Sequence, residues 1–191
     1  MLKSQFQKKF IEAGCDEVGR GCIAGPVVAA AVIMPPDYKN NSIIDSKKLS
    51  PKKREVVEKE IIKNARSWAI ASVSNNTIDK INILNASILA MHRALDKLDT
   101  KPEFILIDGN QFKKYKKLRH ECIIKGDNKY QNIAAASILA KNYRDKLMQD
   151  LSSRFDKYSW ETNFGYPTKK HRDSIKKYGV TEYHRKSFKL L

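Results

Sequence analysis

The sequence predicts an α/β protein in which a mixed β-sheet is flanked by helices. Short apolar runs alternate with longer stretches of helical periodicity along most of the chain. The first two predicted strands are separated by too few residues for a helical crossover, so we expect them to pair antiparallel. No internal repeat, low-complexity tract or linker interrupts the 191 residues. We therefore expect one domain, residues 1–191, with a C-terminal helical extension from about residue 152.

The predicted strands are apolar runs that stop at turn-forming or charged residues. Residues 27–34 ("VVAAAVIM") are continuously apolar and are followed by two prolines, a pattern typical of a strand buried on both faces. A shorter run, residues 11–15, precedes it and ends at an acidic pair. Residues 67–73 ("SWAIASV") alternate in part between apolar and polar side chains. Two further strands are predicted, one at residues 104–107 and one in "ECIIKGD" (121–127), ending near Asp127.

The predicted helices are recognised by start signals and apolar stripes. Ser50 followed by Pro51 is a capping residue with proline at the first helical position. Residues 82–98 give the clearest helix, because their large apolar side chains recur at alternating steps of four and three. Residues 132–151 predict a second long helix, whose alanine-rich start allows close packing on a sheet. Residues 169–178 predict the last helix.

The charge balance indicates a polyanionic partner. Lys and Arg number 37 against 21 Asp and Glu, a net charge of +16. The longest apolar run, residues 27–34, is far shorter than the ~20 residues that span a bilayer, and residues 1–10 lack the apolar stretch of a signal peptide. We therefore expect a cytoplasmic protein that binds no membrane, and the charge alone fits either a nucleic-acid-binding protein or one that is merely basic. Cys15, Cys22 and Cys122 form no C-x-x-C pair and are expected to be reduced thiols.

Four acidic residues follow three short apolar runs. Asp16 and Glu17 come after "IEAGC", Asp108 after "FILI", and Asp127 shortly after "CII". If these strands lie side by side, their ends bring four carboxylates into one cleft. Mutual repulsion opposes such a cluster unless divalent cations neutralise it, and oxygen-only ligands favour Mg²⁺ or Mn²⁺. Asp108 alone fits an ordinary Asp-Gly-Asn turn, but four such acids in a basic chain favour a two-metal phosphodiesterase site.

The stretch "DEVGRGCIAGPV", residues 16–27, resembles the signature of the type 2 ribonucleases H, specifically the bacterial ribonuclease HII family. Further motifs match the family in order and spacing and extend the resemblance over nearly the whole chain. They are "DSKKLS" (45–50), "INILNASILAMHRAL" (81–95), "LIDGN" (106–110), "KGD" (125–127), "IAAASILAKNYRD" (133–145), "GYPTKKH" (165–171) and "HRKSF" (184–188).

The resemblance implies a ribonuclease H-like fold, with a five-stranded mixed sheet flanked by helices and a C-terminal helical segment. It implies an endonuclease that cleaves the RNA strand of RNA–DNA hybrids and nicks DNA on the 5′ side of an embedded ribonucleotide, leaving 5′-phosphate and 3′-hydroxyl ends. Carried over residue by residue, Asp16, Glu17, Asp108 and Asp127 are the catalytic ligands of two Mn²⁺ or Mg²⁺ ions. The expected partners are an RNA–DNA hybrid and a DNA duplex with an embedded ribonucleotide, bound by a monomer.

The resemblance also assigns substrate contacts. Only the 2′-hydroxyl distinguishes an embedded ribonucleotide from DNA, and backbone at Gly19 and Gly21 can approach the sugar because glycine has no side chain. The family reads the hydroxyl with this glycine-arginine-glycine segment, while Arg20 engages a neighbouring phosphate. Tyr166 resembles the family tyrosine that packs at the RNA–DNA junction, and stacking contributes ~1–3 kcal/mol. Lys47 and Lys48 are expected phosphate contacts.

Two positions depart from the family pattern, and two other functions compete. Tyr130 and Asn132 stand where serines are common, which predicts altered hydrogen bonding around Asp127. A 3′–5′ exonuclease with four carboxylates begins with Asp-x-Glu, whereas Asp16 and Glu17 are adjacent. A noncatalytic basic nucleic-acid-binding protein needs neither four placed acids nor the glycine-arginine-glycine segment. Metal-dependent nicking at one ribonucleotide separates the three functions.

Overall fold

A five-stranded mixed sheet forms the centre of the computed structural model, which describes residues 2–191. The strand order is β3-β2-β1-β4-β5. β1 pairs antiparallel with β2, β2 pairs antiparallel with β3, and the β1–β4 and β4–β5 pairs are parallel. The strands are β1 (Glu12–Val18), β2 (Val27–Ile33), β3 (Ser67–Val73), β4 (Phe104–Asp108) and β5 (Arg119–Ile123). The predicted mixed sheet and its antiparallel first pair are confirmed.

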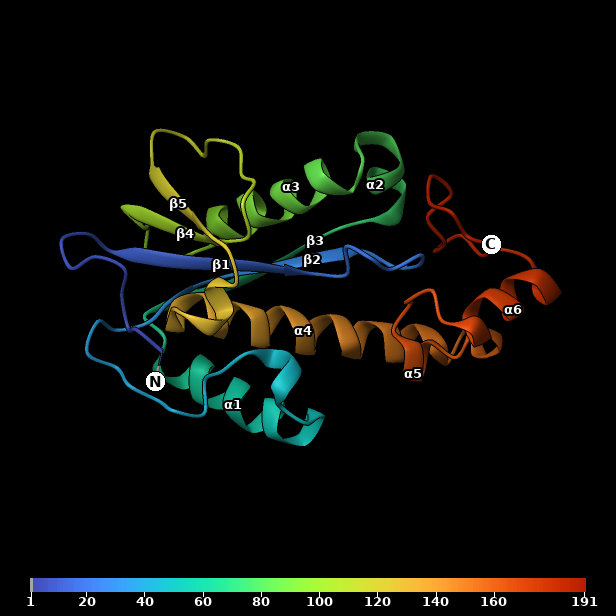
Figure 1. The fold of residues 1–191 in the computed structure, drawn as a ribbon, viewed down its shortest axis with the longest axis horizontal. Helices are drawn as coiled ribbons and strands as arrows, with labels where there is room; N and C mark the ends of the chain where they lie inside the picture. Colours follow the sequence, from blue (N-terminus) through green and yellow to red (C-terminus); the bar gives the residue numbers. More distant parts are fainter. Residues whose placement is uncertain (1) are drawn as a thin grey trace.

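Helices cover both faces of this sheet (Figure 1). One face is covered by α3 and the other by α4, with α1 packed outside α4 (Figure 1). The α-helices are α1 (Pro51–Asn64), α2 (Asn75–Ile81), α3 (Ile83–Asp96), α4 (Gln131–Ser152), α5 (Trp160–Asn163) and α6 (Lys169–Tyr178). Short 3-10 helices are η1 (Ser46–Lys48), η2 (Gly126–Asn128) and η3 (Asp156–Tyr158).

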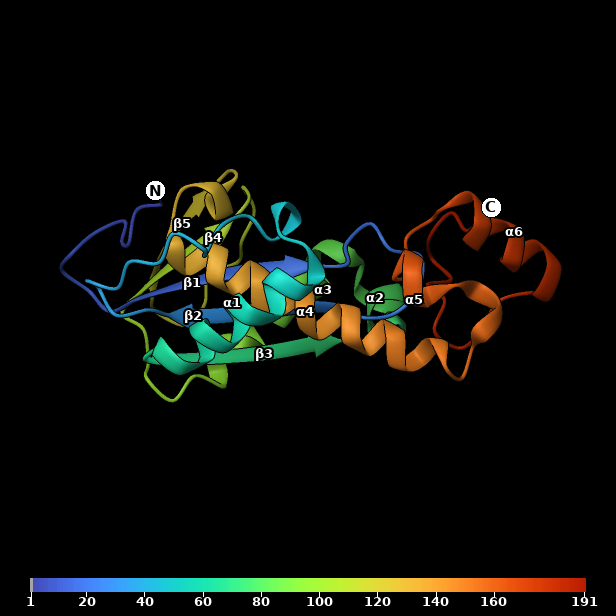
Figure 2. The ribbon, with the colours of Figure 1, turned by 90° about the horizontal axis from the view of Figure 1, so that it is seen from below.

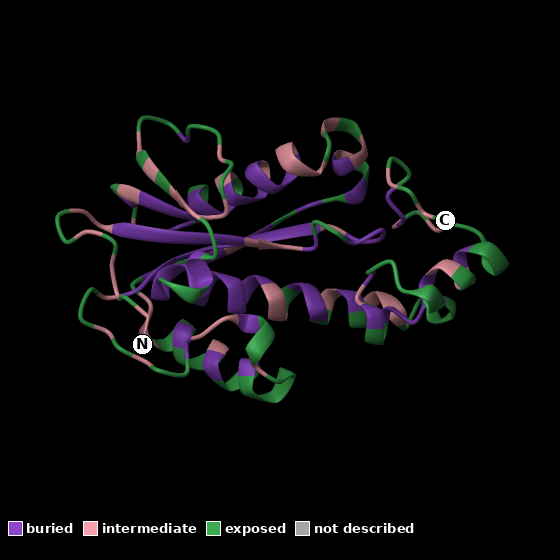
Figure 3. Cartoon of the chain, viewed as in Figure 1, coloured by how far each residue is buried: buried purple, intermediate pink, exposed green. Residues whose placement is uncertain are grey.

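The central strand β2 is buried along its whole length because helices pack on both of its sides (Figure 3). Small side chains allow this close packing. The alanine-rich start of α4 contacts one face, and a Cβ at Gly14 of β1 would lie 2.3 Å from the backbone of Asn132. This close approach fixes α4 directly over β1, the strand that carries Asp16 and Glu17.

Three predicted boundaries are wrong in detail. The single helix expected over residues 82–98 begins at Ile83, and the preceding α2 was not expected. Asn82 separates the two helices, because it adopts a φ of 64° and its side chain caps α3 through the N–H of Asn85. β1 continues through Asp16 and Glu17 because Glu17 still pairs with Ala29. β5 begins at Arg119, before the apolar residues that predicted it, and it ends at Ile123, not near Asp127, because residues 126–128 form η2.

The chain after α4 lies beyond one end of the sheet (Figure 2). α5, α6 and the tail surround an apolar cluster in which Trp160 and Met148 pack against Ile23 and Ala24. Ile23 and Ala24 belong to the loop that joins β1 to β2. The C-terminal segment and the loop that follows Asp16 and Glu17 are therefore held together. None of the helices within residues 2–191 has the length and apolar character required to cross a membrane.

Candidate active site

Four carboxylates from three neighbouring elements line one cavity. Asp16 and Glu17 lie near the end of β1, Asp108 is the last residue of β4, and Asp127 lies in η2 just after β5. Since β1, β4 and β5 are adjacent and parallel, their carboxyl ends meet at one edge of the sheet. The cavity measures about 410 Å³. Its other lining residues are Val18, Ser46, Lys47, Ser137, Lys141 and Tyr166.

Backbone and side-chain donors orient these carboxylates. The N–H of Gly126 donates to Oδ1 of Asp108 at 2.6 Å, which joins the end of β4 to the start of η2. The N–H of Glu17 donates to Oδ1 of Asp16 at 2.7 Å. Nδ2 of Asn128 donates to Oδ1 of Asp127 at 3.0 Å. Each of these three carboxylates thus has a donor that restrains it in the cavity.

Burial and mutual repulsion make the carboxyl groups of Asp16, Glu17 and Asp108 hard to ionise. Burial raises the pKa of Asp16 well above its usual range, and the charges of Glu17 and Asp108 raise it further. Burial also raises the pKa of Glu17, against the opposing effect of the Arg20 guanidinium. The pKa of Asp108 is raised by burial although the N–H of Gly126 stabilises its ionised form. A cation is the group that would relieve these unfavourable charges.

The donor chemistry of the cavity fits a divalent metal ion. Within residues 2–191, no three carboxylate, imidazole or thiol groups are already gathered into a ready-made metal site. The four acids nevertheless share one cavity, and the residues that line it include no histidine or cysteine. An oxygen-only set of this kind suits Mg²⁺ or Mn²⁺ and not Zn²⁺. Asp16, Glu17, Asp108 and Asp127 are the side chains available to hold such an ion.

Some of the predicted substrate-binding side chains line this cavity and others do not. Tyr166 lines it and is 37% exposed, so part of its side chain is accessible to a ligand. Lys47 also lines it. Lys48 does not, because its Nζ donates to Oδ1 of Asn128 at 2.7 Å. The arrangement brings Lys47 and Tyr166 to the carboxylates and leaves Lys48 at the margin.

The glycine-arginine-glycine segment lies beside the carboxylates. Nη1 of the exposed Arg20 donates to Oε1 of Glu17 at 3.2 Å. Gly19 is buried with a φ of +95°, whereas Gly21 is exposed. A Cβ at Gly21 would meet only Cε1 of Tyr166, at 4.0 Å, so open space lies over this residue. The exposed backbone of Gly21 is therefore accessible next to the Tyr166 ring.

Sequence reasoning missed three polar residues of the cavity, Ser46, Ser137 and Lys141. Ser137 and Lys141 lie one helical turn apart on α4, and Ser137 provides a hydrogen bond to Asp16. The hydroxyls of Ser46 and Ser137 are 3.0 Å apart. The signal was present in "IAAASILAK", where a serine and a lysine four positions apart interrupt an otherwise apolar helix.

The two departures from the family pattern point away from Asp127. Oδ1 of Asn132 accepts the N–H of Met34, and its Nδ2 donates to the carbonyl and carboxylate oxygens of Glu12. Tyr130 packs edge-on against Phe6. Asn132 therefore connects α4 to the start of β1, and Tyr130 packs on the segment that precedes β1.

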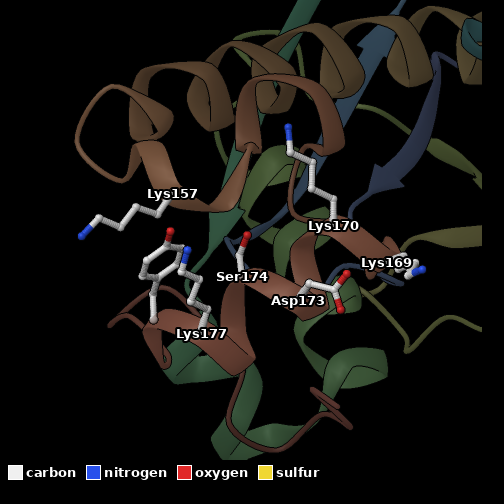
Figure 4. A pocket seen from close by; sticks show the side chains of 7 residues that line it. Lys157, Lys169, Lys170, Asp173, Ser174 and Lys177 are labelled. Carbon is white, nitrogen blue, oxygen red and sulfur yellow. The ribbon is translucent and has the colours of Figure 1, made fainter.

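A second hollow, of about 570 Å³, lies on the C-terminal segment (Figure 4). Lys157 from η3 and Lys169, Lys170 and Lys177 from α6 surround it, together with Asp173. Its lining is cationic and contains a single carboxylate, so it adds to the positive surface but offers no set of metal ligands.

Comparisons with known proteins agree with this geometry. The family model "Ribonuclease HII" matches residues 13–191. Ribonuclease HII of Bacteroides fragilis is 57% identical over 191 residues, which cover the whole of this chain and 95% of that protein. The ribonuclease HII in the Archaeoglobus fulgidus PCNA complex is 27% identical with a TM-score of 0.79, covering 94% of this chain and 95% of the other.

The Pyrococcus horikoshii ribonuclease H2 structure has the same fold, with a TM-score of 0.80 and 24% identity over 94% of each chain. The predicted ribonuclease H-like architecture is thereby confirmed. Since the family model and the curated relative both extend over nearly all of the sequence, the chain belongs to the ribonuclease HII family.

Proposed function

We propose that this chain is a divalent-metal-dependent endonuclease that nicks duplex DNA on the 5′ side of an embedded ribonucleotide and leaves 5′-phosphate and 3′-hydroxyl ends. Its membership of the ribonuclease HII family identifies it as an endoribonuclease acting on RNA–DNA hybrids. The observation that carries the finer proposal is the shared cavity, in which four carboxylates lie with Tyr166 and beside the exposed Gly21.

Asp16, Glu17, Asp108 and Asp127 are the proposed ligands of two Mg²⁺ or Mn²⁺ ions. Divalent cations at such a site supply an activated water and neutralise charge on the phosphate and the leaving oxygen. The raised pKa values of Asp16, Glu17 and Asp108 support the proposal, because a bound cation favours the ionised form of each of these groups.

The remaining residues of the cavity are proposed to bind and orient the substrate. Lys47 lines the cavity and provides a positive charge for a phosphate near the cleavage point. The exposed Arg20 is paired with Glu17 and can exchange that carboxylate for a phosphate. The exposed part of the Tyr166 side chain is suited to pack on the sugar or base at the junction. Gly21 leaves the backbone free to approach the 2′-hydroxyl.

The proposed partners are RNA–DNA hybrids and DNA duplexes with an embedded ribonucleotide, bound by a monomer. The net charge of +16 supports binding to a polyanion. Cys15, Cys22 and Cys122 are all unpaired, which supports work in the reducing cytoplasm.

The carboxylate assignment is tested with Asp16→Asn and Asp108→Asn. We expect each variant to lose cleavage of a duplex with one ribonucleotide, while it keeps its fold and its affinity for the duplex, because the basic surface is unchanged. Asp150→Asn, which neutralises an exposed carboxylate on α4 away from the cavity, is the matched control and should cleave normally. Near-normal turnover by either site variant in saturating Mg²⁺ or Mn²⁺ would falsify the assignment.

A further inference from the structure

Two arginines are buried beneath the segment Gly19–Gly21 without a carboxylate partner. Arg144 of α4 and Arg185 of the C-terminal tail are both 0% exposed. The ion pairs within residues 2–191 involve neither of them. A buried unpaired charge costs several kcal/mol unless polar groups compensate it. Other polar groups must therefore stabilise these two buried charges.

Backbone carbonyls take the place of the missing carboxylates. Arg144 donates to the carbonyls of Pro26, Phe164 and Ala24 at 3.0, 2.7 and 3.1 Å. Arg185 donates from Nε to the carbonyl of Gly25 at 3.0 Å and from Nη1 to that of Arg20 at 3.1 Å. The two guanidinium groups thus fix the direction of carbonyls along the whole loop between β1 and β2.

The contact between Arg185 and Arg20 determines where the next N–H points. In a trans peptide the C=O and the following N–H point in opposite directions, and the described residues contain no cis peptide. Because the carbonyl of Arg20 points inward to buried Arg185, the N–H of Gly21 points outward. Gly21 is exposed, and its N–H has no hydrogen-bond acceptor within residues 2–191.

The outward N–H lies at the proposed recognition site. The position of a Cβ on Gly21 is 4.0 Å from the Tyr166 ring, and that ring lines the cavity of the four carboxylates. We propose that Arg185 is a positioning residue for substrate recognition, because its hold on the Arg20 carbonyl presents the Gly21 N–H to an acceptor oxygen of the ribonucleotide. This inference rests on the proposed function and assigns a role within it to a residue that does not touch the substrate.

The positive charge of Arg185 also favours binding of an anionic substrate at the Gly19–Gly21 segment. Nη2 of Arg185 has no partner within residues 2–191, and Asp79, the nearby carboxylate, instead accepts the N–H groups of Lys186 and Ser187. Positive charge beneath the Gly19–Gly21 segment therefore remains available to attract an oxygen acceptor or a phosphate above it.

The test measures binding preference in EDTA, so that no cleavage occurs. Fluorescence anisotropy compares a DNA duplex containing one ribonucleotide with the same duplex made of DNA alone. Arg185→Met removes the donors and keeps the bulk of the side chain, and Arg185→Lys restores one donor and the charge. Arg172→Met is the matched control, because Arg172 also donates to two backbone carbonyls, those of Lys189 and Leu190, in the same C-terminal segment.

We expect Arg185→Met to lose about two- to tenfold of the preference for the ribonucleotide, the effect of one hydrogen bond. Affinity for the all-DNA duplex should change less, Arg185→Lys should recover part of the preference, and Arg172→Met should retain it. A folded Arg185→Met with the full wild-type preference overturns the positioning role. A wild type with no preference and no ribonucleotide-dependent cleavage overturns the proposed function itself.

A second measurement needs no variant of Arg185 to fold. In wild-type protein labelled with ¹⁵N-glycine, eight glycine amides are observed at most, and the Gly21 signal is assigned by its loss in Gly21→Ala. The ribonucleotide duplex should shift the Gly21 amide more than the all-DNA duplex does. An amide that responds equally to both duplexes, or to neither, overturns the inference.

Discussion

Gly19 and Gly21 should respond in opposite ways to the same substitution. Gly19 has a φ of +95°, and a Cβ there would lie 2.3 Å from Nε and 2.9 Å from Cδ of Arg144. Arg144 cannot move aside easily, because three backbone carbonyls hold its guanidinium. Gly21 has ordinary van der Waals space, with the nearest atom of Tyr166 at 4.0 Å.

The expected destabilisation follows from these two environments. For Gly19→Ala, the left-handed backbone costs ~1–2 kcal/mol and overpacking against Arg144 costs ~1–3 kcal/mol. The free energy of unfolding should therefore fall by ~2–5 kcal/mol. For Gly21→Ala, the change should stay within ~0.5 kcal/mol, as at other surface positions. Its effect should appear instead in cleavage, because the new methyl group occupies the open space beside Tyr166.

Urea unfolding followed by circular dichroism gives both free energies, and cleavage of a duplex with one ribonucleotide gives the activities. The reasoning predicts an unstable Gly19→Ala and a stable but poorly active Gly21→Ala. Equal stability of the two variants would refute the argument that Arg144 excludes a side chain at Gly19. Full activity of Gly21→Ala would refute close approach of the substrate to this backbone.

Three further outcomes are expected. Burial and neighbouring charges raise the pKa of Asp16 in the folded protein. The free energy of unfolding is therefore highest while Asp16 is protonated, below its unfolded pKa of ~4, and it falls as the pH rises through the higher folded pKa. Without divalent ions, Asp16→Asn should therefore melt at a higher temperature than wild type at neutral pH, and melting curves at acid pH should converge; a constant difference would contradict this. Affinity for duplexes should fall steeply across a salt series, because Lys and Arg displace counterions from phosphates, and a flat response would mean that the +16 charge faces elsewhere. Tyr166→Ala should reduce kcat/KM more for a single ribonucleotide than for continuous RNA, with Tyr166→Phe milder, whereas an equal loss on both substrates would make Tyr166 a general contact.

The sequence was most informative where the pattern is local. The apolar run of β2 and the Ser50-Pro51 start of α1 identified their elements directly, because burial on both faces and helix capping leave residue-level signals. Boundaries set by pairing were harder to predict. β1 extends over Asp16 and Glu17 because β2 supplies partners for them, and an acidic pair has no intrinsic preference for a strand.

The cavity could be predicted only in part, because some of its residues are brought together by tertiary packing. Acids at the ends of three strands predicted that Asp16, Glu17, Asp108 and Asp127 come together, and they line one cavity. The contribution of Ser46 depends on how η1 packs against α4, which no local pattern reports. The buried contacts of Arg185 join residues 160 positions or more apart, so they too became visible only in the folded chain.

Cleavage of three end-labelled duplexes in Mg²⁺ or Mn²⁺ tests the central claim most directly. One duplex carries a single ribonucleotide in DNA, the second pairs a long RNA with DNA, and the third is DNA alone. The account predicts incision on the 5′ side of the single ribonucleotide with a 3′-hydroxyl end, cleavage of the RNA in the hybrid, and no cleavage of the third. Cleavage of the all-DNA duplex at a comparable rate, or an intact single-ribonucleotide duplex while the hybrid is cut, would contradict it.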